Sequence, residues 1–98
     1  MFSDPTLEMI RREIDSVDET IVVLLGKRTR LVEQIAEVKA KKSFVRDENR
    51  ENEILTRLCS LAGQNGIKEG VVEQVYRMLF EHFVELQTIK NNMCAKHN

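Results

Sequence analysis

The 98-residue sequence has little of several residue types, and each shortage excludes a class of protein. It contains no tryptophan, one proline and four glycines, which favours an all-helical chain because proline and glycine interrupt helices. Its 15 basic and 16 acidic side chains leave a formal net charge of -1, whereas nucleic-acid-binding proteins usually carry a strong basic excess. We therefore expect an all-α fold and no nucleic-acid partner.

Long apolar runs and cysteine motifs are also missing. No stretch approaches the ~20 consecutive apolar residues that a transmembrane helix needs. The first residues become polar at once, so we expect no signal peptide, no membrane partner and a cytoplasmic protein. Cys59 and Cys94 have neither metal-ligand spacing nor a CxxC motif, and we expect no metal and no cofactor. At this length, residues 1–98 are expected to form a single domain.

The main pattern that is present is an apolar seam with one charged member. Alternating steps of three and four residues give Leu7, Ile10, Ile14, Val17, Ile21, Leu24, Arg28, Leu31, Ile35 and Val38. This heptad spacing places every member on one side of a helix. Because desolvating an unpaired charge costs more than apolar packing gains, Arg28 needs an anion beside it, either a carboxylate of the protein or a ligand.

The seam lies on one long predicted helix. Asp4 is a good N-cap, Pro5 suits the first helical position, and no helix-ending residue follows before Lys42. Such a helix would be ~55 Å long, whereas a compact chain of this size has a radius of gyration of only ~13 Å. The rest of the chain is too small to cover the seam, so we expect an obligate homodimer in which the long helices pack together.

Two further helices are predicted. Residues 43–46 indicate a short non-helical link, and Asp47 is the N-cap of a second helix that continues to about Ala62. A third helix is predicted over residues 68–91, and residues 92–98 are expected to form a frayed, disordered tail. The expected protomer therefore has three helices, of which the first is very long.

Two cationic residues of the first helix indicate an anion site. Arg28 and Lys39 are eleven residues apart, which is ~20° past three full turns, so they share a face at a spacing of ~16 Å. With the apolar residues between them they form a slot for a compact dicarboxylate. Arg11 is rotated by ~100° from Arg28 and would reach the partner's slot in an antiparallel dimer. The sequence has no Ser/His/Asp set or glycine-rich phosphate loop, so the slot suits chemistry done by positioning and charge stabilisation.

Two other polar features have simple structural explanations when each is taken alone. Asp47, Arg50 and Glu51 open the second predicted helix, where such a cluster is typical of a helix cap with local ion pairs. Gln87 lies at the edge of the apolar stripe of the third helix, as an ordinary core or surface glutamine often does. Their combination with the slot is what makes them candidates for a binding site.

Five short segments follow one another along the chain. They are I-R-R-E-I-D-S-V-D ending at Asp18, L-L-G-K-R ending at Arg28, E-V-K-A-K-K ending at Lys42, V-R-D-E-N-R-E ending at Glu51, and F-E-H-F-V-E-L-Q ending at Gln87. In this order and at these separations they resemble the AroQ-type chorismate mutases, the all-helical class, over nearly all of residues 7–90. The resemblance implies an intertwined homodimer of three-helix protomers with two active sites, each of which takes one arginine from the partner.

The resemblance also implies a role for each matching residue. Arg11 from the partner and Arg28 from the same chain would each clamp a carboxylate of chorismate. Lys39 would contact a carboxylate and the ether oxygen, and Gln87 would donate to that oxygen. Chorismate would then rearrange to prephenate, a step of aromatic amino acid biosynthesis in the shikimate pathway, without a cofactor.

Asp47 (through its backbone) and Glu51 would meet the ring hydroxyl of the substrate, with Arg50 supporting the site. Phe83 departs from the pattern, because relatives can carry a small hydroxyl residue there that contacts a carboxylate. An isochorismate pyruvate lyase or a 4-amino-4-deoxychorismate mutase would keep most of the same cationic frame and is an alternative. A second alternative is a non-catalytic helical dimerisation or regulatory domain, in which Arg28 fixes helix register beside an internal carboxylate such as Glu51.

Overall fold

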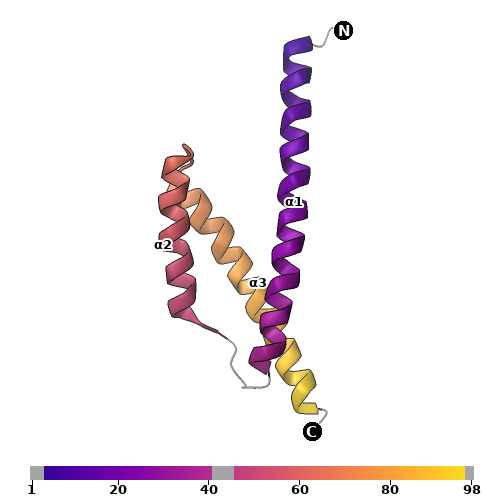
Figure 1. Ribbon diagram of the computed structural model, residues 1–98, viewed down its shortest axis with the longest axis vertical. Helices are drawn as coiled ribbons and strands as arrows, with labels where there is room; N and C mark the ends of the chain where they lie inside the picture. Colours follow the sequence, from indigo (N-terminus) through magenta and orange to yellow (C-terminus); the bar gives the residue numbers. More distant parts are fainter. Residues whose placement is uncertain (1–3, 41–45, 97–98) are drawn as a thin grey trace. The chain divides into compact units, whose positions relative to one another are not determined.

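The computed structural model describes residues 4–40 and 46–96, apart from the side chains of residues 39–40, 87 and 90–96. The chain forms three helices, which are α1 (Pro5–Ala40), α2 (Glu48–Gln64) and α3 (Glu69–Lys96) (Figure 1). Within the described ranges there is no strand. The predicted all-α fold with three helices is confirmed.

Helix α1 begins where the sequence predicts. The Asp4 side chain accepts a hydrogen bond from the Thr6 backbone N–H at 2.9 Å, and the Asp4 carbonyl accepts one from the Glu8 N–H at 3.0 Å. Pro5, which has no N–H to satisfy, occupies the first helical position. The predicted end of the helix at Lys42 lies outside the described residues.

Helix α2 has a well-formed cap at each end. Asp47 is its N-cap, as predicted, and the helix ends at Gln64, two residues later than predicted. In the turn that follows, Gly66 has a φ of +72°, a left-handed conformation that glycine adopts without strain. The Ile67 N–H then bonds back to the Ala62 carbonyl at 2.9 Å, which completes a Schellman motif and satisfies the end of the helix.

Helix α3 is longer than predicted. It begins at Glu69 and continues to Lys96, whereas the sequence predicted an end at Asn91 followed by a frayed tail. The predicted end of the helix at Asn91 is therefore wrong, and the disordered tail stays a prediction. The physical reason is that residues 92–96 contain neither proline nor glycine, so nothing in them ends a helix that is already formed. Residues 97–98 lie outside the described part of the chain.

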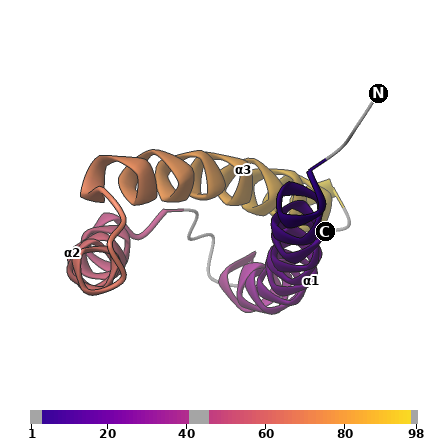
Figure 2. The same ribbon diagram turned by 90° about the horizontal axis from the view of Figure 1, so that it is seen from above.

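The chain divides into two compact units, Met1–Leu31 and Val32–Asn98. In the second unit α2 and α3 form an antiparallel hairpin around the turn at residues 65–68 (Figures 1 and 2). The core of this unit is small, and its buried apolar residues are Ala36, Leu55, Ala62, Phe80 and Phe83. Edge-on packing of the Tyr76 and Phe80 rings, with centroids 6.2 Å apart, extends the core along α3.

The apolar seam of α1 is exposed along its whole length. Its nine apolar members each keep between 43% and 58% of their surface exposed; they are Leu7, Ile10, Ile14, Val17, Ile21, Leu24, Leu31, Ile35 and Val38. A single soluble protomer rarely presents a contiguous apolar surface of this extent. The seam therefore marks the face of α1 that is available for another helix.

Candidate active site

The first turn of α2 is built around Asp47. Its carboxylate oxygen Oδ1 accepts a hydrogen bond from the Arg50 backbone N–H at 3.0 Å, and its carbonyl accepts one from the Glu51 N–H at 3.0 Å. The side chain is thus used for capping, which satisfies a donor that the helix itself leaves without a partner. This geometry engages the backbone carbonyl and one carboxylate oxygen of Asp47 in the cap.

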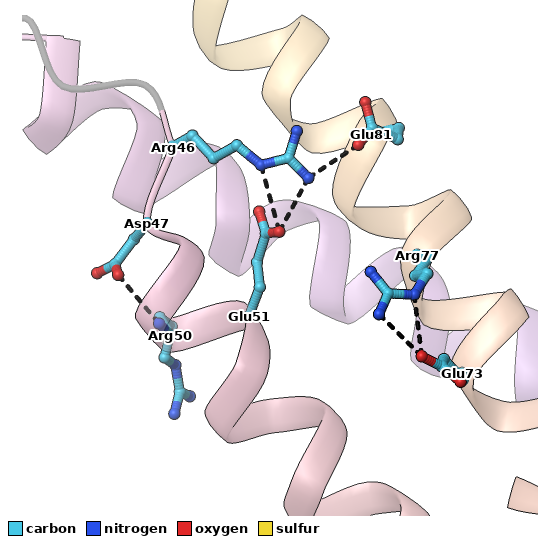
Figure 3. Close-up of polar contacts among 7 residues, drawn as sticks. All are labelled: Arg46, Asp47, Arg50, Glu51, Glu73, Arg77 and Glu81. Atoms are coloured by element: carbon cyan, nitrogen blue, oxygen red, sulfur yellow. Dashed lines mark hydrogen bonds and ion pairs between the residues drawn. The ribbon is translucent and has the colours of Figure 1, made fainter.

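Glu51 is held by an arginine that lies outside the predicted set of site residues. Both Nε and a terminal nitrogen of Arg46 donate to the same Glu51 oxygen, Oε1, at 3.3 and 2.9 Å (Figure 3). The same terminal nitrogen of Arg46 also donates to Glu81 of α3 at 2.8 Å. Only 17% of the Glu51 side chain is exposed. Arg46 therefore joins the beginning of α2 to α3 through two carboxylates.

The two carboxylates also keep Arg46 charged. The hydrogen bond with Glu51, followed by that with Glu81, raises the pKa of the Arg46 guanidinium above its ordinary value. Because the pKa is higher in the folded than in the unfolded chain, the resulting stabilisation is complete below the ordinary pKa and is lost only above it. The guanidinium is therefore cationic at every pH at which the protein would be assayed.

Arg50 does not take part in this cluster. Its side chain extends away from Glu51 (Figure 3) and donates to Glu53 at 2.7 Å in a pair that is exposed to solvent. Exposed pairs of this kind contribute little to stability and are readily exchanged for another anion. The Arg50 side chain is thus exposed beside Glu53, and Arg50 contacts Asp47, another predicted site residue, through its backbone N–H.

Phe83 belongs to the core of the second unit. Only 7% of it is exposed, and its ring lies 5.8 Å from that of His82. It has no hydroxyl with which to contact a carboxylate. The expectation that Phe83 lies against the substrate stays a prediction. Gln87 lies one turn further along α3, and its side chain is outside the described part of the structure.

The cationic residues of α1 are placed only in part. Arg28 is half-buried on the helix, whereas 64% of the Arg11 side chain is exposed and lies 3.8 Å from Glu8. Lys39 belongs to α1 as well, but its side chain is outside the description. Arg11 and Arg28 belong to the first unit and Lys39 to the second. The slot between Arg28 and Lys39 therefore stays a prediction.

The described residues contain no group of three or more His, Cys, Asp or Glu side chains placed to hold a metal ion. In the same part of the chain, no helix is both long and apolar enough to cross a membrane.

Residues 10–88 match the family described as "Chorismate mutase type II". The chain belongs to this family. All eight of the predicted site residues lie inside the matched range; they are Arg11, Arg28, Lys39, Asp47, Arg50, Glu51, Phe83 and Gln87. The resemblance found in the five segments is thereby confirmed at the level of the family.

Individual relatives agree with the family match. The chain is 30% identical over 82 residues to the chorismate mutase of Methanocaldococcus jannaschii, a match that covers 83% of each protein. It is 34% identical over 100 residues to the bifunctional chorismate mutase/prephenate dehydratase of Buchnera aphidicola subsp. Schizaphis graminum. That match covers 100% of this chain and 26% of the relative, so the chain spans about a quarter of the bifunctional protein's length.

Arg46 and Glu81 are the residues that sequence reasoning missed in this type II chorismate mutase domain. Arg46 stands inside the V-R-D-E-N-R-E segment but was assigned to the link before α2. Its two partners are five and 35 residues away along the chain, and no helical spacing connects positions at the second separation. The sequence pointed to this contact only through the charge of Arg46 and its position. An arginine directly before an N-cap lies outside the helix, so its side chain can reach a neighbouring element.

Proposed function

We propose that this protein is a chorismate mutase, which converts chorismate into prephenate. The observation that carries the proposal is the family match over residues 10–88, within which all the predicted site residues lie. The reaction is an intramolecular rearrangement in which one C–O bond breaks and one C–C bond forms. No proton or group is exchanged with the protein, so positioning and electrostatic stabilisation are sufficient for catalysis.

The functional unit in this proposal is an intertwined homodimer with two active sites. Support comes from the α1 seam, whose nine apolar members keep 43–58% of their surface exposed in one chain. A second copy supplies a surface of the same heptad pattern and covers both seams at once. The exposed Arg11 of each chain is then available to the site of the other.

Two cations clamp the substrate. Chorismate is a flexible dianion, and it reacts only when its enolpyruvyl arm is folded over the ring. Arg28 of one chain and Arg11 of the other hold the two carboxylates, which selects the folded conformer and removes entropy from the barrier. The half-burial of Arg28 supports this role, because a partly desolvated guanidinium binds a carboxylate more strongly than an exposed one.

Two donors stabilise the transition state. As the C–O bond stretches, negative charge grows on the ether oxygen, and Lys39 and Gln87 donate to it. These donors stabilise the transition state more than the ground state, which is the condition for a higher kcat. Removal of one preorganised donor of this kind typically costs ~3–4 kcal/mol of barrier.

The ring hydroxyl meets the beginning of α2. The Glu51 carboxylate accepts a hydrogen bond from the ring hydroxyl, and the backbone of Asp47 makes a second contact with it. Support comes from two observations: Asp47 caps the helix at the same turn, and Glu51 is mostly buried with one oxygen held by Arg46.

The proposal is tested by incubating the purified protein separately with chorismate, isochorismate and 4-amino-4-deoxychorismate and identifying the products by mass spectrometry. Prephenate from chorismate is the expected result. Phe83 is the observation that favours a second candidate, because it cannot donate a hydrogen bond to a carboxylate. Pyruvate release from isochorismate would instead identify an isochorismate pyruvate lyase. Turnover of 4-amino-4-deoxychorismate alone would identify a 4-amino-4-deoxychorismate mutase.

A matched pair of lysine variants separates catalysis from folding. Lys39→Ala should lower kcat by about a hundredfold or more while leaving the melting temperature nearly unchanged, because Lys39 holds the reacting oxygen. Lys27→Ala, on the exposed part of α1 outside the seam, should keep full activity. A wild type that leaves chorismate unchanged, together with a Lys39→Ala chain that unfolds, would favour the dimerisation or regulatory domain.

A further inference from the structure

We propose that Arg46, anchored by Glu81, is a positioning residue that holds Glu51 for the ring hydroxyl of the substrate. The proposal rests on the function proposed above and extends it to two residues that no part of the family comparison assigns. It is argued from the contacts at the beginning of α2, all of which lie in the second unit of the chain.

The two oxygens of the Glu51 carboxylate have different surroundings. Arg46 occupies Oε1 with two hydrogen bonds, at 3.3 and 2.9 Å. Among the described residues, Oε2 of Glu51 receives no hydrogen bond. A carboxylate held by one oxygen presents the other in a defined direction, and an ionised carboxylate only accepts hydrogen bonds. Glu51 is therefore prepared for a donor such as a hydroxyl.

The Arg46 side chain also has an anchor on α3. Arg46 precedes the Asp47 cap, so its backbone lies outside α2, and Glu51 is the residue of α2 that its side chain bonds. The bond of 2.8 Å to Glu81 supplies the anchor from the neighbouring helix (Figure 3). Arg46 and Glu51 are therefore ordered before the substrate binds. The conformational entropy of both side chains is lost on folding and not on substrate binding.

Arg46 also affects the charge at Glu51. The substrate is a dianion, and a glutamate without a nearby cation would repel it more strongly. The guanidinium of Arg46 lies 2.9 Å from Glu51 and reduces this repulsion without hydrogen-bonding the second oxygen, although it shares its charge with the exposed Glu81. Arg46 thus allows a carboxylate to serve as a hydrogen-bond acceptor inside a site that must attract anions.

The hydroxyl contact changes little between the ground state and the transition state, because the hydroxyl takes no part in the bonds that break or form. If Glu51 is no longer aligned with the hydroxyl, the enzyme loses binding energy that is equal in the ground state and the transition state. Such a loss raises KM and leaves kcat nearly unchanged. Arg46→Gln should raise KM for chorismate about tenfold, the effect of one hydrogen bond to a charged group. Arg46→Lys should recover part of this loss, because it restores the charge but not the two-bond geometry.

A second ion pair of the same helix hairpin is a matched control. Arg77 donates to one oxygen of Glu73 through Nε and a terminal nitrogen at 3.1 and 2.8 Å (Figure 3). Both residues belong to α3, and no hydrogen bond or ion pair joins either of them to a predicted site residue whose side chain the structure describes. Arg77→Gln removes an equivalent pair and should leave KM and kcat unchanged. Equal effects of Arg46→Gln and Arg77→Gln would overturn the positioning role.

A double-mutant cycle with Glu51→Gln tests whether Arg46 acts through Glu51. In the Glu51→Gln background, Arg46→Gln should raise KM by less than about twofold, since there is no longer a carboxylate to align. Methylation of the ring hydroxyl gives a second readout: wild type should discriminate against the methyl ether, and Arg46→Gln should lose most of that discrimination. A purely structural role for Arg46 predicts additive effects and unchanged discrimination, and either result would refute the proposal.

The same experiments separate this proposal from the proposed function. If wild-type protein produces no prephenate, the mutase assignment fails before any variant is compared. If wild type is active and Arg46→Gln retains its KM and its preference for the free hydroxyl, only the positioning role fails. Circular dichroism of each variant, compared with Arg77→Gln, shows that the helices are intact.

Discussion

The exposed seam of α1 makes a quantitative prediction about assembly. Ile21 lies in the middle of the seam and keeps 48% of its surface exposed in the single chain. Complete burial of an isoleucine side chain contributes ~1.5–3 kcal/mol, so about half of this, ~1 kcal/mol, remains to be gained at each Ile21 when the dimer forms. Both copies are affected, and Ile21→Ala should therefore weaken the dimer by about 2 kcal/mol, or about thirtyfold in Kd.

Ile21→Asp should have a much larger effect. It loses the same apolar burial and also places two carboxylates in the interface, each of which costs several kcal/mol to desolvate. We expect Kd to rise by at least about a thousandfold, which corresponds to ~4 kcal/mol. Ser16→Asp is the matched control, because it adds the same charge to an exposed position of α1 outside the seam; it should leave the dimer intact.

Sedimentation equilibrium over a dilution series measures these dissociation constants, and circular dichroism reports whether α1 stays helical. Activity should fall in parallel with the fraction of dimer, because in the proposed homodimer each site takes an arginine from the partner. A wild type that is monomeric and fully helical at all concentrations would refute the reasoning. So would an Ile21→Asp chain whose dissociation constant matches that of Ser16→Asp.

Two further predictions concern the site. Arg11→Ala and Arg28→Ala should each be nearly inactive dimers, and mixing them should restore part of the activity after subunit exchange, because one site of the hybrid is intact; no recovery after verified exchange would count against a shared site. Asp47→Ala should lower the free energy of unfolding by about 1 kcal/mol through loss of the α2 cap, a shift of ~4–8 °C in thermal denaturation. Asp47→Asn keeps a capping oxygen and should retain both stability and activity, whereas an inactive but stable Asp47→Asn would show that the carboxylate itself meets the substrate.

Local features of this fold were predictable from the sequence because each depends on neighbouring residues alone. Asp4 and Asp47 cap their helices as expected, since a short acidic side chain before a helical segment bonds the N–H groups directly after it. The heptad spacing of the seam is likewise a local pattern. The end of α3 was predicted too early because a frayed tail was inferred from position in the chain rather than from a residue that ends helices.

Contacts between helices were not predictable in the same way. Arg46 and Glu81 are 35 residues apart, and their hydrogen bond exists only because the turn at residues 65–68 folds α3 back along α2. The burial of Phe83 likewise depends on residues that are distant in the sequence. Periodicity along a helix determines which face a side chain occupies, and so the sequence alone determined the caps, the seam and the candidate residues. The face of one helix that meets another is set by the summed packing of many side chains, and only the tertiary structure decided that Arg46 is anchored by Glu81.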